Sequence, residues 1–431
     1  MKIEIKNGRV IDPAQGIDRV TSLFVAAGKI AGLGAAPAGW HGNRVIDARG
    51  LVVCPGLIDV SARLREPGFE YKATLESEMD AAIAGGVTSL ACPPDTDPPL
   101  DEPGLVEMLK HRARLLNLAH VYPIGALTVQ LGGTTLTEMG ELTEAGCVAF
   151  SHADVPLVDT LVLFRAMQYA ATFGHRVWLR PQDPHLGRGG VAHDGEVATR
   201  LGLAAIPSSA ETIALATIFA LIRDTGVRVH LCRLSSAEGV AMVRAAKREG
   251  LPVTSDVAIH HLHLCDVDIG WFDSQVHLKP PLRGTSDRAA LRTGVADGTI
   301  DAICSDHTPV DDDAKQLPFA EAEAGATGLE LLLPLTLKWA AEERVGLPAA
   351  LAKITRAPAL LLDIDAGTLA TGHPADVCIF DPAAHWKVEP AALKSQGKNT
   401  PFLGLELPGR VRHTLVDGVV VGGDSSTPAN A

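Results

Sequence analysis

The sequence predicts a (β/α)8 barrel accompanied by a small β domain built from both ends of the chain. Between Pro55 and about Leu362, short apolar segments of strand length alternate with longer helix-compatible segments. Residues 1–52 and the region after Gly367 read instead as short strands broken by turn residues. Apolar residues make up 46% of the chain and aromatic residues only 4%, which suits an α/β core of Ala, Val, Leu and Ile.

The predicted β domain comprises residues 1–54 and 366–431, and its two parts form a small β-sandwich in this interpretation. Its strands alternate apolar and polar residues between turn signals such as Asn-Gly and Gly-Lys. We expect them at Lys2–Lys6, Arg9–Ile11, Leu23–Ala26, Asn43–Asp47, Val377–Phe380, Arg410–Val416 and Val419–Val421. The small and polar residues Gly422–Ala431 predict a loose tail.

The predicted barrel comprises residues 55–365, where strands and helices follow one another along the chain. The strand segments are apolar runs of four to eight residues, which is typical of buried parallel strands. They include Thr88–Cys92, Val121–Gly125, Val148–Ser151, Arg176–Leu179, Arg228–Leu231, Val253–Val257 and Ala302–Ser305. Helices are expected between them, at Leu75–Ala84, Leu157–Thr172, Ser209–Asp224 and Ala237–Glu249 among others.

Charge and cysteine content restrict the class of protein. The net charge of −13 disfavours a nucleic-acid partner, because a phosphate backbone would be repelled. The seven cysteines are odd in number, scattered and without a Cys-x-x-Cys pair, which indicates reduced thiols. No apolar run approaches the ~18 residues of a membrane helix, and the first residues lack the apolar region of a signal peptide. We expect a soluble cytoplasmic protein without a membrane partner.

The segment from Gly56 to Gly68 carries the most specific motif of the chain. It reads Gly-Leu-Ile-Asp-Val-Ser61-Ala-Arg63-Leu-Arg65-Glu-Pro-Gly. This resembles the first barrel strand of the amidohydrolase superfamily, in its dihydroorotase line, where the pattern is Gly-Leu-Ile-Asp-x-His-x-His-x-Arg-x-Pro-Gly. Alternate strand residues point the same way, so the two His of the family can hold one metal ion. In this chain Ser61 and Arg63 stand at those two positions.

The resemblance covers nearly the whole chain and implies further metal-ligand positions at later strand ends. In Val177-Trp-Leu-Arg180 and in Val229-His-Leu-Cys-Arg233, an arginine stands where the family has a ligand His. A guanidinium group offers no lone pair to a metal and stays protonated in proteins. The segment before Asp154 matches the one that supplies the bridging ligand, but it contains no Lys, and Asp154 is displaced, with His152 or Ala153 nearer the expected place.

The resemblance also implies a substrate pocket that is only partly retained. Asp306 stands at the position of the family's metal-held general base, and Arg65 at that of the group that binds the substrate carboxylate. The family's two substrate-facing Asn residues are replaced by Asp95 and Lys279, and a second His is replaced by Val310. The predicted vestigial pocket therefore consists of Arg65, Asp95, Lys279, His307 and Val310.

These replacements predict that no catalytic residue operates and that no metal or other cofactor binds. One carboxylate, that of Asp306, is too few for a catalytic zinc ion, which takes about three protein ligands. The chain is similar to the non-catalytic dihydroorotase-like subunits that some bacteria have with aspartate transcarbamoylase. That resemblance implies a pseudoenzyme of pyrimidine biosynthesis, assembled with the catalytic chain of aspartate transcarbamoylase in a large hetero-oligomer that also involves self-association.

Two other functions remain open on the sequence. The first is an active zinc-dependent cyclic amide hydrolase, a dihydroorotase or hydantoinase, with a degenerate metal site and with Asp306 as base; a mononuclear site of His152, His307 and Asp306 is one form of it. The second is a sensor of small anions that uses the arginine cluster. The simplest interpretation of the cluster is charge compensation, in which the arginines pair with carboxylates such as Asp95, because unpaired buried charges are costly.

Overall fold

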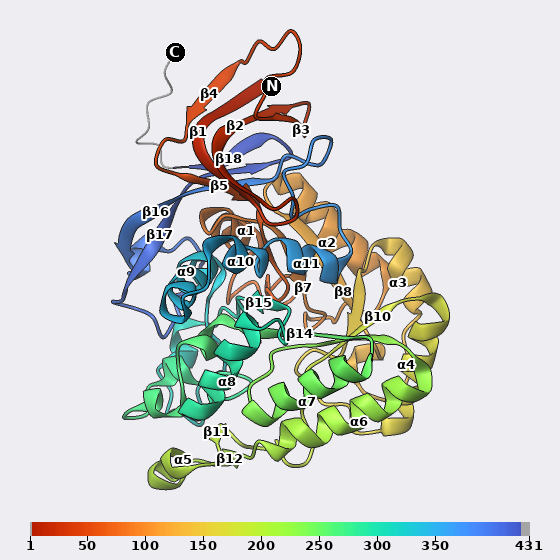
Figure 1. Ribbon diagram of the computed structural model, residues 1–431. Helices are drawn as coiled ribbons and strands as arrows, with labels where there is room; N and C mark the ends of the chain where they lie inside the picture. Colours follow the sequence, from red (N-terminus) through yellow and green to blue (C-terminus); the bar gives the residue numbers. More distant parts are fainter. Residues whose placement is uncertain (1, 424–431) are drawn as a thin grey trace.

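The computed structural model describes residues 2–423 and confirms the predicted barrel (Figure 1). Eight parallel strands lie side by side in sequence order. A backbone bridge between Ala62 and His307 joins the first strand end to the last, where Arg63 N donates to His307 O at 2.9 Å. The strands are β6 (Leu57–Asp59), β7 (Val87–Cys92), β8 (His120–Ala126), β9 (Ala149–Ser151), β10 (Arg176–Leu179), β13 (Arg228–Leu231), β14 (Val253–Ala258) and β15 (Ala302–Cys304).

Helices connect these strands and pack around the barrel (Figure 1). Their ends follow local capping chemistry: the Thr74 hydroxyl accepts from Ser77 N at the start of α1, and Gly250 ends α7 in the left-handed conformation. The helices are α1 (Leu75–Ala84), α2 (Pro103–Leu116), α3 (Met139–Ala145), α4 (Thr160–Phe173), α6 (Ser209–Thr225), α7 (Ala237–Glu249), α8 (Thr285–Ala296), α9 (Leu332–Glu343), α10 (Leu347–Ala352) and α11 (Arg356–Leu362).

A second sheet joins both ends of the chain, as predicted (Figure 1). Its central pairing is antiparallel and places Cys378 of β16 opposite Cys54 of β5. A compact core of its own, which includes Ile5, Val25 and Ile379, is fully buried. The strands are β1 (Lys2–Asp12), β2 (Ile17–Ala26), β3 (Lys29–Leu33), β4 (Arg44–Asp47), β5 (Val52–Pro55), β16 (Val377–Lys387), β17 (Glu406–Val416) and β18 (Val419–Gly423).

The N-terminal strands differ from the prediction at Asn7-Gly8. We expected a turn between two strands there, but β1 runs on through it, with a change of register between Ile5 and Gly8. Asn7 adopts a positive φ of 63°, a conformation that Asn tolerates better than most residues. The Asn-Gly pair therefore forms a local β-bulge instead of a turn, and the strand continues.

A small excursion leaves the barrel between β10 and α6. It contains β11 (Ala192–His193), α5 (Glu196–Leu201) and β12 (Ala205–Ile206), which lie at the foot of Figure 1. The 3-10 helices η3 (Asp266–Ile269) and η4 (Ser274–Val276) share a satellite core with it. That core consists of Ala192, Val197, Ala198, Ile269, Val276, Leu278, Leu282, Phe319 and Ala326.

The boundaries of the four helices named from the sequence agree to within one residue, except that α4 begins at Thr160 rather than at Leu157. The Asp159 carboxylate accepts from Leu161 N at 2.8 Å and so caps the helix there. Of the predicted loose tail, Gly422 and Gly423 belong to β18, and residues 424–431 lie outside the described residues. Within residues 2–423, no helix combines the length and apolar character needed to cross a bilayer.

Candidate functional site

The barrel brings the charged residues picked out by the sequence together at one mouth. Each lies within four residues of the end of a strand, and the carboxyl ends of parallel strands meet at the same face of a barrel. The side chains that meet there are Ser61 and Arg63 after β6, Asp95 after β7, Asp154 after β9, Arg180 after β10, Arg233 after β13 and Asp306 after β15.

Asp154 lies at the centre of this group and contacts all three arginines. Its Oδ1 atom lies 2.7 Å from Arg180 Nε and 2.6 Å from Arg233 Nη2. Its Oδ2 atom lies 2.8 Å from Arg63 Nη2. The sequence left this segment ambiguous, with His152 or Ala153 as alternatives. The structure places Asp154 in the mouth because Ala153, with a positive φ of 48°, turns the backbone after β9.

Arg63 links the other two carboxylates to the centre. Its Nε atom donates to Asp95 at 2.8 Å, and its Nη1 atom donates to Asp306 at 3.3 Å and to Thr308 at 3.0 Å. Arg233 Nη1 donates to the same Asp306 oxygen at 2.9 Å. The expected charge compensation is therefore observed, but only Arg63 pairs with Asp95, and the other two arginines use Asp154 and Asp306.

Burial makes this cluster electrostatically strong. The three arginine side chains are 5–6% exposed, and that of Asp306 is 8% exposed. Burial tends to raise the pKa of Asp154, but the three guanidinium groups outweigh it and hold that pKa well below its usual range. At Asp306 burial dominates and raises the pKa, against the opposing effect of Arg233 and Arg63. For the cationic Arg180, burial has the opposite sign and lowers the pKa, although the charge of Asp154 raises it.

The residues assigned to the vestigial substrate pocket differ in burial and in their contacts. Arg65 is buried, and its Nε atom donates to Pro309 O at 2.8 Å. Val310 is buried and Lys279 is exposed. The His307 ring turns away from the mouth. Its Nε2 atom contacts Glu78 at 2.5 Å, and its Nδ1 atom accepts from Gly328 N at 3.1 Å. Of this set, Asp95 forms an ion pair with Arg63, and the Lys279 carbonyl oxygen accepts from Arg233 Nη1 at 3.4 Å.

The structure does not bring the predicted mononuclear trio together. His152 Nε2 lies 2.8 Å from Thr128 Oγ1, and its Nδ1 lies 2.7 Å from Val155 O. His307 is engaged with Glu78. Asp306 therefore has neither imidazole as a companion, and its contacts in the mouth are to Arg63, Arg233 and, at 3.5 Å, Ser61.

The donor atoms at the mouth do not fit the dinuclear metal centre that the family resemblance implies. Guanidinium groups stand at three of the four ligand positions and a hydroxyl at the fourth. Elsewhere among residues 2–423, the buried His230 and Asp256 and the half-buried Cys232 form a group whose donor atoms lie within 4.8 Å of one another. Such a donor set suits zinc. In the structure His230 Nε2 hydrogen-bonds Asp256 at 2.8 Å, and Arg233 N donates to the other Asp256 oxygen at 2.7 Å.

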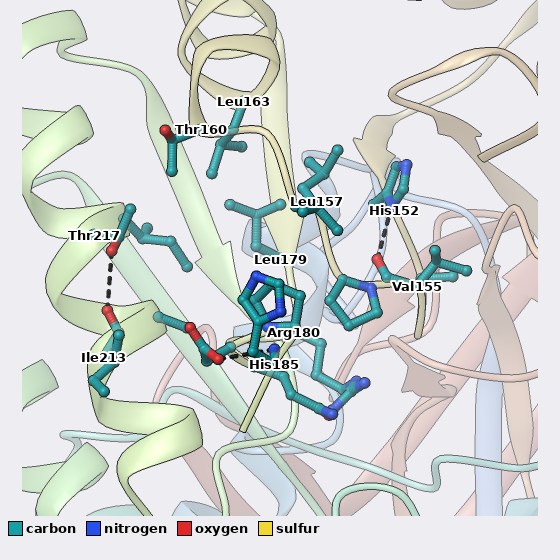
Figure 2. A pocket seen from close by; sticks show the side chains of 18 residues that line it. His152, Val155, Leu157, Thr160, Leu163, Leu179, Arg180, His185, Ile213 and Thr217 are labelled. Atoms are coloured by element: carbon teal, nitrogen blue, oxygen red, sulfur yellow. Dashed lines mark hydrogen bonds between the residues drawn. The ribbon is translucent and has the colours of Figure 1, made fainter. Parts of the chain in front are cut away.

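A cavity of about 160 Å³ adjoins the mouth between α4 and α6 (Figure 2). Apolar side chains such as Leu157, Leu163 and Leu179 line one part of it, while Arg180 and His185 lie together at another. Arg180 lines the cavity and also belongs to the ion cluster. Its guanidinium group forms an ion pair with Asp154 and a hydrogen bond with Gln182. The cavity supports the hypothesis of an anion sensor. Against it, each of the described mouth arginines already has a carboxylate partner.

One supporting residue was missed by reasoning from the sequence. Glu211, buried on α6, accepts from both the backbone N–H and the hydroxyl of Ser235 and of Ser236, at 2.5–3.0 Å. These serines follow Arg233 after one intervening residue, so Glu211 fixes the loop that carries this arginine into the mouth. The sequence signal is a carboxylate near the start of a largely apolar helix, in Ser-Ala-Glu-Thr-Ile-Ala-Leu-Ala.

Comparisons with known proteins agree with this geometry. Residues 50–239 match the family model described as dihydro-orotase-like, and residues 191–422 match that of the amidohydrolase family. A dihydroorotase-like protein of Pseudomonas aeruginosa is 48% identical over 97% of this chain and 99% of its own length. A dihydroorotase of Geotalea daltonii is 43% identical over 98% of this chain and 99% of its own.

Solved structures share the fold. An L-hydantoinase (dihydropyrimidinase) from Arthrobacter aurescens superposes with a TM-score of 0.87 at 24% identity, over 98% of this chain and 96% of that one. A D-hydantoinase superposes with a TM-score of 0.82 at 22% identity, over 98% of this chain and 96% of that one. At these identities the likeness concerns the fold alone.

The prediction that the chain is not an enzyme is contradicted by the relatives. Proteins 42–43% identical over 97–98% of the chain bear the name dihydroorotase, which is the name of an enzyme. The group of His230, Cys232 and Asp256 also offers a candidate metal site that the sequence analysis overlooked. The replaced ligand positions at the mouth led to the prediction, and they are insufficient to exclude an enzyme.

Proposed function

Because the chain belongs to the dihydroorotase-like amidohydrolase family, we propose that it serves pyrimidine biosynthesis as a subunit assembled with the catalytic chain of aspartate transcarbamoylase. The observation that carries this proposal is the arginine–carboxylate cluster at the barrel mouth. This cluster ties six strand ends together with ion pairs, so the barrel is a braced framework on which a partner could assemble. Self-association and a cytoplasmic location belong to the same proposal, and all seven cysteines are free thiols.

Co-expression with the transcarbamoylase catalytic chain of the same organism tests the proposal. We expect one large species in size-exclusion chromatography with light scattering, and carbamoyltransferase activity that falls when this chain is omitted. The matched control is the transcarbamoylase chain expressed alone under the same promoter. Separate elution of the two chains, with full transferase activity in the control, would refute the assembly role.

Hydrolysis of a cyclic amide is the second candidate, and the relatives named dihydroorotase favour it directly. On this proposal the Asp306 carboxylate at the mouth would act as a base, and its raised pKa suits proton transfer. The purified chain would then convert dihydroorotate, and Asp306→Asn would abolish the conversion. Metal analysis of the wild-type chain and of Cys232→Ser would show whether the group at Cys232 holds zinc. No turnover above a heat-treated sample would exclude this candidate.

Restoring only the first pair of family ligands should not increase turnover. We expect Ser61→His with Arg63→His to show no gain in dihydroorotate hydrolysis over the unsubstituted chain, because Arg180 and Arg233 still occupy the other two ligand positions. Loss of Arg63 also leaves Asp95 without its ion pair. Steady-state assays with added zinc measure the effect, and Arg63→Lys is the control for loss of the guanidinium alone. A clear gain by the double variant would show that our account of the mouth is incorrect.

A further inference from the structure

An exposed tryptophan stands out on the satellite part of the barrel. Trp271, between η3 and η4, is 93% exposed, and its neighbour Phe272 is 44% exposed. Val267 is 54% exposed on η3. A large aromatic residue this exposed is unusual on a surface that contacts only water, whereas tryptophan is enriched at the centres of protein interfaces.

The backbone holds Trp271 outward on a firm base. Ile269 and Val276, on either side of it in the sequence, are 2% and 5% exposed and are anchored in the satellite core. Between them Gly270 and Phe272 adopt positive φ angles of 52° and 64°. The Asp273 carboxylate caps η4 through Gln275 N at 2.9 Å. The side chain of Trp271 is therefore presented by an ordered loop, which lowers the entropy cost of binding.

A second segment completes the patch. Ser274 O accepts from Lys315 Nζ at 2.9 Å, which places the 3-10 helix η5 (Asp312–Lys315) against η4. Leu317, two residues farther, is 48% exposed. We define the knob as Val267, Trp271, Phe272 and Leu317.

The charges on these two segments have one sign. Asp268 and Asp273 are exposed beside Trp271, and Asp311, Asp312 and Asp313 are exposed on the adjoining segment. Lys315, the basic residue between them, is buried and donates to the Ser274 and His277 carbonyl groups. The knob is thus apolar at its centre and acidic at its rim.

We infer that the knob is a docking site for a protein partner whose surface offers an apolar pocket rimmed by lysine and arginine side chains. A second copy of this chain fits less well, because a symmetric contact would bring two acidic rims together on molecules of net charge −13. This inference rests on the proposed function, and the partner in question is the transcarbamoylase catalytic chain.

Binding measurements with variants of the knob test the inference. The two purified chains are titrated by isothermal calorimetry at low and at moderate salt. We expect Trp271→Ala to weaken binding about 30-fold or more, as for a central interface tryptophan. The pair Asp312→Asn and Asp313→Asn should weaken binding several-fold at low salt and less at moderate salt. Leu115→Ala, at a position 72% exposed on α2, is the matched control and should bind as the wild type does.

The outcomes separate the inference from the proposed function. Tight binding by the wild type and equal binding by Trp271→Ala would overturn the knob while the assembly role stands. No binding by the wild type would overturn both. If the wild type instead self-associates and Trp271→Ala does not, the knob contacts a second copy, and the inferred basic partner is wrong. Because Trp271 makes little contact with the core, its variant should keep the wild-type melting temperature.

Discussion

Asp154→Asn should cost about 3 kcal/mol of unfolding free energy, the largest stability effect that we expect from a single substitution in the mouth. The amide preserves the shape of the side chain but removes the charge that Arg63, Arg180 and Arg233 share. Three buried guanidinium groups would then face Asp95 and Asp306 alone. Urea unfolding followed by circular dichroism measures the loss.

Two further variants make this prediction specific. Asp80→Asn removes an exposed carboxylate of α1 and should change stability by less than about 0.5 kcal/mol. Adding Arg180→Met to Asp154→Asn removes the guanidinium that depends most on Asp154 and should restore part of the loss. A stability of Asp154→Asn within about 1 kcal/mol of the wild type would show that the cluster does not depend on this carboxylate.

The contribution of Asp154 should depend on pH in a defined direction. Its pKa is lower in the folded chain than the ordinary value of 3.8, so the folded state favours the charged form. The stabilisation is therefore complete above the ordinary pKa and is lost as the pH falls through the folded-state value. The stability difference between the wild type and Asp154→Asn should stay constant from pH 7 to about 5 and shrink in stronger acid.

Glu211→Gln should cost about 2–3 kcal/mol, because a buried carboxylate that accepts four hydrogen bonds is replaced by a group with one acceptor oxygen. The amide N–H₂ would face a backbone N–H of Ser235 or Ser236, which leaves a buried donor unpaired. Chemical denaturation measures the loss. Glu107→Gln, on the exposed face of α2, is the control and should be nearly neutral.

The Glu211→Gln variant should also loosen the loop that positions Arg233 at the barrel mouth. Ser235 and Ser236 continue the loop that positions Arg233, so loosening them should increase hydrogen exchange at residues 232–236 as well as reduce global stability. An equal loss of stability without faster local exchange would mean that Glu211 acts on α6 alone. A neutral Glu211→Gln would contradict the role that we assign to these hydrogen bonds.

The barrel, the sheet from both termini and the residues at the strand ends could all be predicted from the amino-acid pattern. The periodic apolar runs set the strands, and strand ends of a parallel barrel must meet at one face. The pattern alone therefore places Arg63, Arg180, Arg233 and Asp306 at the mouth.

Which charges pair, and which residues turn out of the site, follows from contacts between segments that are distant in the sequence. Pairing depends on side-chain reach across strands far apart in the sequence, so Asp154 became the centre through a backbone turn at Ala153 that no local pattern predicts. His307 follows Asp306 directly, yet its ring turns to Glu78 on α1. The exposure of Trp271 likewise depends on the satellite core beneath it, which assembles residues from 192 to 326. Local sequence preference determines the helices and strands, whereas contacts between distant segments determine which side chains meet at the barrel mouth.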